Sequence, residues 1–294
     1  MAMRISPYLL LTLANLFWAG NWIVGRGMRG DVPPLALSFW RWAIALAFIL
    51  PLAWPHLRRD WPRLAAGWPW VLLFGLLGTA CYNALAYIGL QYTTAVNGLL
   101  LNSFIPIVIA CLGWLFLGKR LRPIEAVGIG ASFLGVLVIV ARGDGTTLSA
   151  LQFNVGDLWI LVSVVVWALY TLALPHRPKV DPMSFLAAIA VVGMIGLIPF
   201  YAWELSEGHY INASPAALAA IAYAGIFPAF LGFLFWNRGV AETDPAKAGL
   251  FLHLLPAFGI LLSMLFLDEH PEPFHFVGIG LIFAGIWLNT RQRA

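Results

Sequence analysis

The chain contains two similar stretches: residues 123–135 read PIEAVGIGASFLG, and residues 273–285 read PFHFVGIGLIFAG. The offset of 150 residues continues upstream without a gap, and 13 of the 43 positions from 95 to 137 are identical to their partners. Two glycine pairs further upstream keep this offset: Gly75 with Gly225, and Gly89 with Gly239. An apolar composition alone does not align prolines and glycines in this way, so the sequence indicates an internal duplication.

Composition places both copies in a membrane. Of the 294 residues, 61% are hydrophobic and 10% are charged, whereas soluble domains carry about a quarter charged residues. Ten stretches reach the roughly 20 apolar residues that a bilayer span requires. They lie near residues 8–25, 34–54, 67–89, 95–117, 123–141, 157–175, 183–203, 215–236, 246–267 and 273–290. We therefore predict an all-α polytopic membrane protein with ten transmembrane helices.

The ten spans divide into two repeats of five. Residues 1–141 form the N-terminal repeat, residues 142–156 a linker, and residues 157–294 the C-terminal repeat. Because five is odd, the second repeat starts from the opposite side of the membrane, and the repeats are inverted. Inverted repeats recur in secondary transporters, which bind their substrates near the midplane between the two halves.

Basic residues predict the orientation of the chain. With a cytoplasmic N-terminus, 13 lysines and arginines fall in cytoplasmic segments and 3 in outside segments. This excess follows the positive-inside rule and predicts that both termini are cytoplasmic. The net charge of +4 therefore reflects the loops of a membrane protein, and we predict no binding of nucleic acid. Four tryptophans flank a predicted cytoplasmic loop and are interpreted as interfacial anchors: Trp54, Trp61, Trp68 and Trp70.

Polar side chains inside the spans mark candidate substrate contacts, because positions that face lipid reject them. Two helical stripes combine aromatic and polar residues: Thr79, Tyr82, Asn83 and Tyr87 in the third span, and Ser163, Trp167, Tyr170 and Thr171 in the sixth. Further candidates are Trp18 and Asn21 in the first span, Asn102 and Ser103 in the fourth, and His253 in the ninth. Aromatic rings offer apolar faces and cation–π contacts for an ammonium group, so we expect the two stripes to line a cavity. The alternative for each polar side chain is an interhelical hydrogen bond that only holds the bundle together.

Arg41 is the only basic residue well inside a span, about 10 Å from the outer end of its helix at 1.5 Å per residue. We include it among the candidate substrate-binding residues. Three roles remain open: it binds a substrate carboxylate, pairs with carbonyl groups at a helix end, or extends outward to the membrane surface.

Acidic residues are absent from the middle of the spans, since Glu125, Asp157 and Glu204 all lie near predicted helix ends. A proton-coupled pump usually contains a buried titratable group, and His253 is the sole candidate. We therefore predict a facilitator or a weakly coupled exchanger rather than a strict proton antiporter.

Two prolines, Pro106 and Pro256, occupy equivalent positions in the middle of their spans. Each should bend its helix, either as a hinge for gating or as a fixed bend.

Small residues spaced four apart predict close helix contacts in the fifth and tenth spans. The motifs are Gly128-xxx-Ser132, Ala131-xxx-Gly135 and Gly280-xxx-Ala284. We favour a packing seam within one chain over a dimer interface, and the choice between monomer and homodimer stays open.

Motifs of catalysis are missing from the sequence. It contains no H-E-x-x-H, no G-x-S-x-G and no pair of acids at membrane depth, so we predict that the protein is not an enzyme. Cys81 and Cys111 lie in apolar spans without metal-ligand spacing, and we predict no metal and no cofactor.

Several stretches resemble the EamA-type branch of the drug/metabolite transporter superfamily. They are Trp18-Ala19-Gly20-Asn21, Arg41-Trp42-Ala43 with Leu50-Pro51, Asn83-Ala84-Leu85-Ala86-Tyr87 through Pro106, Gly118-Lys119-Arg120, and Gly128-Ile129-Gly130 with Gly135. A weaker copy ends the chain at Gly278-Ile279-Gly280, and Asp268-Glu269-His270 replaces Gly118-Lys119-Arg120 in the second half. The likeness spans essentially the whole chain, and its loose motifs report fold more than substrate.

The resemblance implies ten helices and the export of small metabolites across a bacterial inner membrane. Within the family, the chain is most similar to exporters of amino acids, including aromatic ones. The residues themselves add that an aromatic cavity with little fixed charge suits zwitterions of varied side chain. The alternatives are other small organic solutes, such as sugar-type metabolites or cationic drugs, or a channel.

Overall fold

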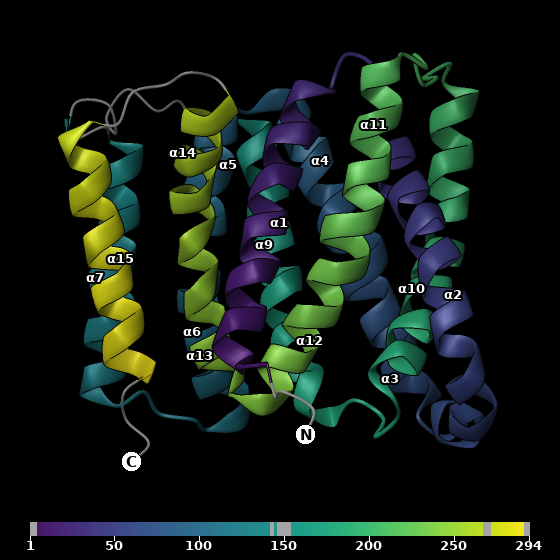
Figure 1. The fold of residues 1–294 in the computed structure, drawn as a ribbon, viewed down its shortest axis with the longest axis horizontal. Helices are drawn as coiled ribbons and strands as arrows, with labels where there is room; N and C mark the ends of the chain where they lie inside the picture. The colour runs from purple at the N-terminus through teal and green to yellow at the C-terminus, as the bar shows by residue number, and fades with distance from the viewer. Residues whose placement is uncertain (1–4, 142–143, 146–153, 267–271, 291–294) are drawn as a thin grey trace.

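The computed structural model describes residues 5–141, 144–145, 154–266 and 272–290 (Figure 1). The first repeat comprises α1 (Pro7–Gly27), α2 (Pro34–Ala66), a third crossing built from α3 (Trp68–Phe74), the π-helical η1 (Gly75–Cys81) and α4 (Tyr82–Tyr92), a fourth crossing built from α5 (Ala95–Asn102) and α6 (Ile105–Leu117), and α7 (Pro123–Val140). The second comprises α9 (Val155–Ala173) with the short η2 (Leu174–His176), α10 (Pro182–Ser206), α11 (Pro215–Ala224) with the π-helical η3 (Gly225–Gly232) and α12 (Phe233–Glu242), α13 (Pro245–Leu250) with η4 (Phe251–His253) and α14 (Leu254–Phe266), and α15 (Pro273–Thr290).

These elements make ten crossings. Nine helical stretches in the described ranges are long and apolar enough to span a membrane. The remaining crossing, the ninth in chain order, is divided among α13, η4 and α14, so that its longest helix has only 13 residues. Within the described residues no strand is present, and the all-α, ten-helix prediction is confirmed. The predicted linker, 142–156, falls largely outside the described residues, and α9 already begins at Val155.

The course of the chain makes the two repeats inverted. In Figure 1, α1 begins and α15 ends on the same face of the bundle, drawn at the bottom, as ten crossings require. We call this the lower face and the opposite one the upper face. The second repeat begins with α9 on the upper face, after five crossings, so its helices run opposite to their counterparts.

The helices α7 and α15 lie side by side along their length (Figure 1), and a seam of glycines lies between them. A Cβ atom added to Gly135 would lie 2.5 Å from the carbonyl oxygen of Gly278, and one added to Gly128 would lie 2.8 Å from that of Gly285. The 150-residue offset pairs Gly128 with Gly278 and Gly135 with Gly285. Exchanging the two repeats therefore converts one glycine contact into the other, which places an approximate two-fold axis within the bundle.

Other helix contacts obey the same exchange. The helix α2 contacts α10, which is its own counterpart. The contact of α4 with α9 corresponds to that of α12 with α1, and the contact of α6 with α9 corresponds to that of α14 with α1. In the same way, the contact of α2 with η3 corresponds to that of α10 with η1. The interface between the halves is thus made twice from equivalent surfaces, and the central helices α1, α4, α9 and α12 lie where those surfaces meet.

The structure contains only part of the packing seam that the small-residue motifs predict. Gly128, Ser132 and Gly135 are all buried against α15. Gly280 and Ala284, in contrast, are exposed, and nothing lies within 4 Å of a Cβ added to Gly280. The Gly280-xxx-Ala284 interpretation is therefore wrong, because the face of α15 that meets α7 is the one carrying Gly278 and Gly285.

The second helix differs from its predicted span. It continues from residue 54, where the span was expected to end, to Ala66, so the predicted cytoplasmic loop is helical and places Trp54 and Trp61 on its exposed side. Three prolines lie inside α2, and all of them are exposed: Pro51, Pro55 and Pro62. A proline on the outer face of a helix bends it and removes one hydrogen bond without ending it.

Interruptions occur at equivalent places in both repeats. The third and eighth crossings contain π-helical segments that start at Gly75 and Gly225, and such segments are frequent at functional sites. The fourth crossing breaks between α5 and α6, and the ninth breaks at η4, in each case just before the equivalent prolines Pro106 and Pro256. The predicted bends therefore take the form of helix interruptions.

The glycine seam yields a stability prediction. Gly135→Val forces apart two backbones that touch, and overpacking of this kind costs about 1–3 kcal/mol. Gly130→Val is the matched control on the same helix, since nothing lies within 4 Å of a Cβ there. Thermal unfolding of the purified protein in detergent should show a lower Tm for Gly135→Val only. Equal losses in the two variants would contradict the seam.

Candidate functional site

Aromatic rings from four crossings meet in the middle of the bundle. Trp18 on α1 lies 5.1 Å from Trp167 on α9 and 5.2 Å from Trp236 on α12, measured between ring centroids. Phe233 lies 5.4 Å and Tyr82 4.5 Å from Trp167. We call these five residues the aromatic centre. It brings together both predicted aromatic-polar stripes and the tryptophan of the first span, with contributions from each repeat.

A tyrosine–asparagine hydrogen bond flanks the aromatic centre on each side. The Tyr87 hydroxyl donates to Asn21 Oδ1 over 2.6 Å toward the upper face, and the Tyr170 hydroxyl donates to Asn237 Oδ1 over 2.6 Å toward the lower face. The first pair joins α4 to α1, and the second joins α9 to α12. These are equivalent helices with the tyrosine and asparagine exchanged. The approximate symmetry therefore extends to the polar side chains.

Arg41 lies beside the upper of these two pairs. Its side chain is fully buried, its Nη1 donates to the Tyr87 hydroxyl over 2.9 Å, and its guanidinium lies 5.8 and 5.9 Å from the ring centroids of Trp42 and Tyr87. Its Nε and Nη2 atoms have no hydrogen-bond partner among the described residues. Full burial rules out extension to the membrane surface, and the bond to a hydroxyl is not the expected contact with helix-end carbonyls.

Indole N–H groups find partners in the π-helical segments. Trp18 Nε1 donates to the carbonyl oxygen of Pro228 in η3, and Trp42 Nε1 donates to that of Thr79 in η1, each over 3.0 Å. The distorted helices thus supply carbonyl acceptors to the centre. In the part of the chain that the structure describes, Trp167 Nε1 and Trp236 Nε1 have no hydrogen-bond partner.

The remaining candidates of the third, fourth and sixth crossings are buried near this region. Tyr82 donates to Asn102 Oδ1 over 3.0 Å. Several polar atoms lack a partner among the described residues: Thr79 Oγ1, Asn83 Nδ2, Asn102 Nδ2 and Thr171 Oγ1. Ser163 donates to the carbonyl of Ile160 within its own helix over 2.7 Å, and this bond gives it a purely structural role.

His253 contacts its own partner in the repeat. Its Nε2 donates to the carbonyl oxygen of Ser103 over 2.8 Å, and its Nδ1 lies 2.6 Å from Ser132 Oγ. Because a carbonyl only accepts, a neutral ring accepts at Nδ1 from the serine hydroxyl. The Ser103 hydroxyl itself bonds to Leu99 within α5. His253 and Ser103 therefore join the two helix interruptions across the approximate axis, with every polar atom of the imidazole used.

Three residues of the site were missed by the sequence analysis. Trp236, Phe233 and Asn237 all lie on α12, and each is buried. The 150-residue offset contained the signal for Asn237, because it pairs with Tyr87. The polar stripe of the third span therefore had a counterpart in the eighth.

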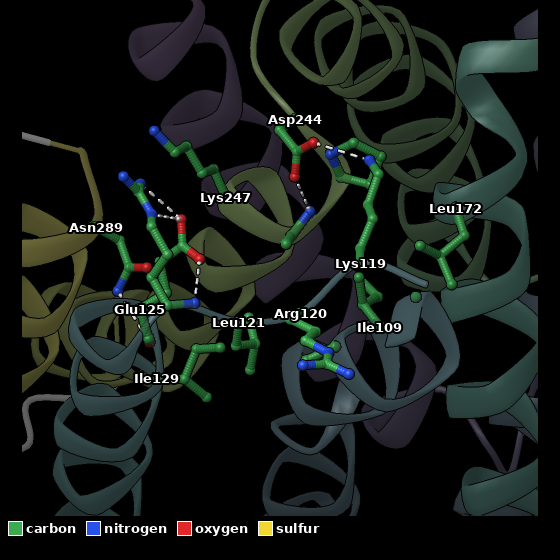
Figure 2. Close-up of a pocket in the computed structure, with 15 residues that line it drawn as sticks. Ile109, Lys119, Arg120, Leu121, Glu125, Ile129, Leu172, Asp244, Lys247 and Asn289 are labelled. Atoms are coloured by element: carbon green, nitrogen blue, oxygen red, sulfur yellow. Dashed lines mark hydrogen bonds and ion pairs between the residues drawn. The ribbon is translucent and has the colours of Figure 1, made fainter. Parts of the chain in front are cut away.

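A pocket of about 490 Å³ opens on the lower face, between the halves (Figure 2). Its inner wall is apolar, with Ile109, Ile129 and Leu172, and its rim is charged. Lys119 Nζ lies 3.2 Å from Asp244 Oδ2, an ion pair that crosses from the α6–α7 connection to the start of α13. A second ion pair on the rim joins Arg122 and Glu125 within the first repeat, at 2.8 Å, and Arg120 and Lys247 also line the pocket.

The described residues contain no group of three potential metal ligands among His, Cys, Asp and Glu. The side chains at the centre offer hydrogen bonding, aromatic contact and the charge of Arg41.

Comparison with known proteins places the chain among transporters. The model of the EamA-like transporter family matches residues 5–141 and again residues 154–291. An uncharacterized transporter, YyaM, of Bacillus subtilis is 27% identical and covers 96% of this chain and 93% of its own. A probable terminal-alkyne amino-acid exporter of Streptantibioticus cattleyicolor is 27% identical over 96% of this chain and 92% of its own. A solved crystal structure shares the fold with a TM-score of 0.77 at 20% identity, covering 97% of this chain and 96% of that one.

The hydrogen bonds of His253 predict a structural role. His253→Ala removes the donor to the Ser103 carbonyl and one of the two partners of the Ser132 hydroxyl, which also contacts the Ile129 carbonyl at 3.1 Å. An unsatisfied buried group costs about 1–3 kcal/mol. We expect a clearly lower Tm in detergent, while His56→Ala, a partly exposed histidine on α2, stays close to the parent protein. An unchanged Tm for His253→Ala would show that these bonds contribute nothing to the fold.

Proposed function

The chain belongs to the EamA-like transporter family, and from this premise we propose that it is a secondary transporter that exports amino acids and related small metabolites. The observation that carries the proposal is the aromatic centre, with its polar neighbours, between two inverted halves. Inverted-repeat transporters bind substrates at the midplane between their halves. Ser163 and His253, whose polar atoms are bonded within the protein, take structural roles in this proposal. The other predicted substrate-binding residues are retained, with the aromatic centre as the core of the site.

Amino acids are favoured by the chemistry of the centre. Tryptophan and tyrosine rings suit an apolar side chain and an ammonium group, and the neighbouring amide and indole N–H groups without partners suit a carboxylate. The relative from Streptantibioticus cattleyicolor, described as a probable amino-acid exporter, supports the same class.

Alternating access is favoured by contacts that join the halves on opposite faces. On the upper face, Thr93 of the first repeat donates to Asp157 of the second over 2.6 Å. On the lower face, Lys119 and Asp244 join the halves. Separation at one face with closure at the other would expose the centre to each side in turn. The pocket of Figure 2 is then the cytoplasmic approach to the site, and Pro106 and Pro256 are hinges at the helix interruptions.

The orientation in this proposal follows the positive-inside rule. The lower face carries Arg58, Arg59, Arg63, Lys119, Arg120, Arg122, Arg177, Lys179, Arg238 and Lys247. It is therefore assigned to the cytoplasm of a bacterial cell, with the protein in the inner membrane as a monomer or homodimer.

Two other functions compete with this one. Other small organic solutes, such as sugar-type metabolites or cationic drugs, are the alternative cargo, although Arg41 adds a positive charge that opposes a cation. A channel is the alternative mechanism, and the duplicated, closely packed interface favours a carrier over an open pore. An enzyme is disfavoured because the family is one of transporters.

Counterflow in proteoliposomes tests the proposal. Vesicles loaded with unlabelled L-phenylalanine should take up labelled L-phenylalanine with saturable kinetics, and collapsing a pH gradient should leave this exchange intact. Other unlabelled L-amino acids should compete, and Trp167→Ala should lower the rate at least tenfold. Trp159→Ala, an exposed tryptophan on the same helix, is the matched control. Flux that is linear in concentration and not stimulated from the opposite side would indicate a channel, and failure of every amino acid to move or compete would contradict the substrate class.

The Lys119–Asp244 pair gives a test of alternating access. Exposed ion pairs contribute about 0.2–1 kcal/mol, so Lys119→Asp or Asp244→Lys should raise the open population of the lower face by up to about fivefold. Maleimide labelling of Ala246→Cys in the pocket, in a background without Cys81 and Cys111, reports that opening. The double exchange should restore the parent rate.

The matched control is the pair Arg238–Glu242, which lies within α12 and does not cross between the halves. Its reversal should leave labelling unchanged. Single variants that label at the parent rate would contradict a role for Lys119 and Asp244 in holding the face closed.

A further inference from the structure

Arg41 is a buried charge without a counter-ion among the described residues. We propose that Arg41 binds the carboxylate of the transported molecule through its Nε–Nη2 edge, which makes the substrates carboxylic acids, amino acids among them. This inference rests on the proposed transport function and names the chemical class that the site selects.

The environment of Arg41 gives its charge little compensation. The side chain is fully buried, and the single hydrogen bond to the Tyr87 hydroxyl uses only Nη1. The rings of Trp42 and Tyr87 offer cation–π contact at 5.8 and 5.9 Å, which weakly favours the charge but accepts none of the remaining N–H groups. A buried, unpaired cation inside a membrane protein is costly and marks a functional site.

The acids of the neighbouring helices are engaged elsewhere. Asp157 accepts from Thr93, and Glu204 accepts from the backbone N–H groups of Leu35 and Ala36. Asp60 accepts from the backbone N–H of Asp181 and pairs with Arg59. The four salt bridges found in the described residues all exclude Arg41.

The fold itself does not require a charge at this position. A Cβ added to Gly225 would meet Ile44 and the carbonyl oxygen of Arg41, whereas one added to the equivalent Gly75 would meet Val192 and the carbonyl oxygen of Ile189. Ile189 therefore occupies the place of Arg41 in the second repeat, and it is buried without any polar group. The same helix contact forms with isoleucine, so packing alone does not explain an arginine.

The geometry of the unpaired atoms matches a carboxylate. Nε and Nη2 lie on one edge of the guanidinium and point the same way, so they donate two parallel hydrogen bonds to the two oxygens of a planar anion. The ring of Trp42 lies 5.8 Å from the guanidinium of Arg41 and 4.9 Å from the ring of Phe233, so Arg41 lies close to the aromatic centre. In the proposal, a carboxylate binds Arg41 and the rest of the molecule contacts the aromatic centre.

The hydrogen bonds of Tyr87 allow Arg41 to be replaced without leaving the tyrosine hydroxyl unbonded. Its hydroxyl donates to Asn21 and accepts from Arg41, so Arg41→Met removes the charge while the tyrosine keeps its own donor bond. Because the apo protein then loses an uncompensated buried charge, Arg41→Met should unfold at the same Tm as the parent or a higher one.

Thermal unfolding of the full-length protein in detergent tests the proposal with matched ligand pairs. L-Phenylalanine and benzoate should raise the Tm of the parent, while phenylalaninamide and benzamide, in which the carboxylate becomes a neutral amide, should not. Arg41→Met should lose the response to both carboxylates, and Arg238→Met, an exposed arginine on α12, should retain it. Arg41→Lys keeps the charge without the two-atom edge and should bind L-phenylalanine at least about tenfold more weakly.

Three results would overturn the proposal: equal responses to acid and amide, a carboxylate response that survives in Arg41→Met, or parent-like affinity in Arg41→Lys. If Arg41→Met does not fold, Arg41→Lys decides alone. The benzoate and benzamide pair keeps this test separate from amino-acid transport. A protein that moves no amino acid, yet is stabilised by benzoate through Arg41, would refute the proposed cargo and not the carboxylate site.

Discussion

The hydrocarbon of a bilayer offers no hydrogen-bonding partner, so each polar group within a span must find one inside the protein. The arrangement of this protein follows from that constraint. The indole groups of Trp18 and Trp42 use carbonyl oxygens of the π-helical segments, and the imidazole of His253 closes the gap between two interrupted helices. Among the described residues, several of the buried polar atoms without partners belong to the aromatic centre or to its neighbours, on Arg41, Asn102, Trp167 and Trp236. In our proposal, a ligand completes the hydrogen bonds of these donors.

Duplication explains the scaffold, and departures from symmetry explain the site. Glycine contacts between α7 and α15 and the two tyrosine–asparagine bonds are made twice, once by each half. An interface built from two equivalent surfaces can open at either face with similar contacts, which suits alternating access. Arg41 breaks the symmetry, because its counterpart is an isoleucine. The charge of Arg41 lies on the upper side of the centre, where in our proposal it would give a bound zwitterion one preferred direction.

Sequence reasoning reached the architecture because lipid imposes a simple rule on length and polarity. The ten crossings and the inversion follow from apolar stretches and an odd number per repeat. Two aromatic-polar stripes were also recognisable, and Trp18, Tyr82 and Trp167 do meet. Periodicity identifies a face of a helix but not the neighbour that the face contacts. It therefore missed Trp236 and Phe233, and it did not show that His253 would contact Ser103. The length of the apolar stretch placed the end of the second span near residue 54, and it did not show that the helix continues through Pro55 and Pro62.

A structure determined with p-bromo-L-phenylalanine tests the central claim most directly, since anomalous scattering locates the bromine without ambiguity. The account predicts the ring and its bromine among Trp18, Trp167 and Phe233, with both carboxylate oxygens on Nε and Nη2 of Arg41. Bromine found only in the pocket beside Lys119 and Asp244, with Arg41 still unpaired, would contradict it.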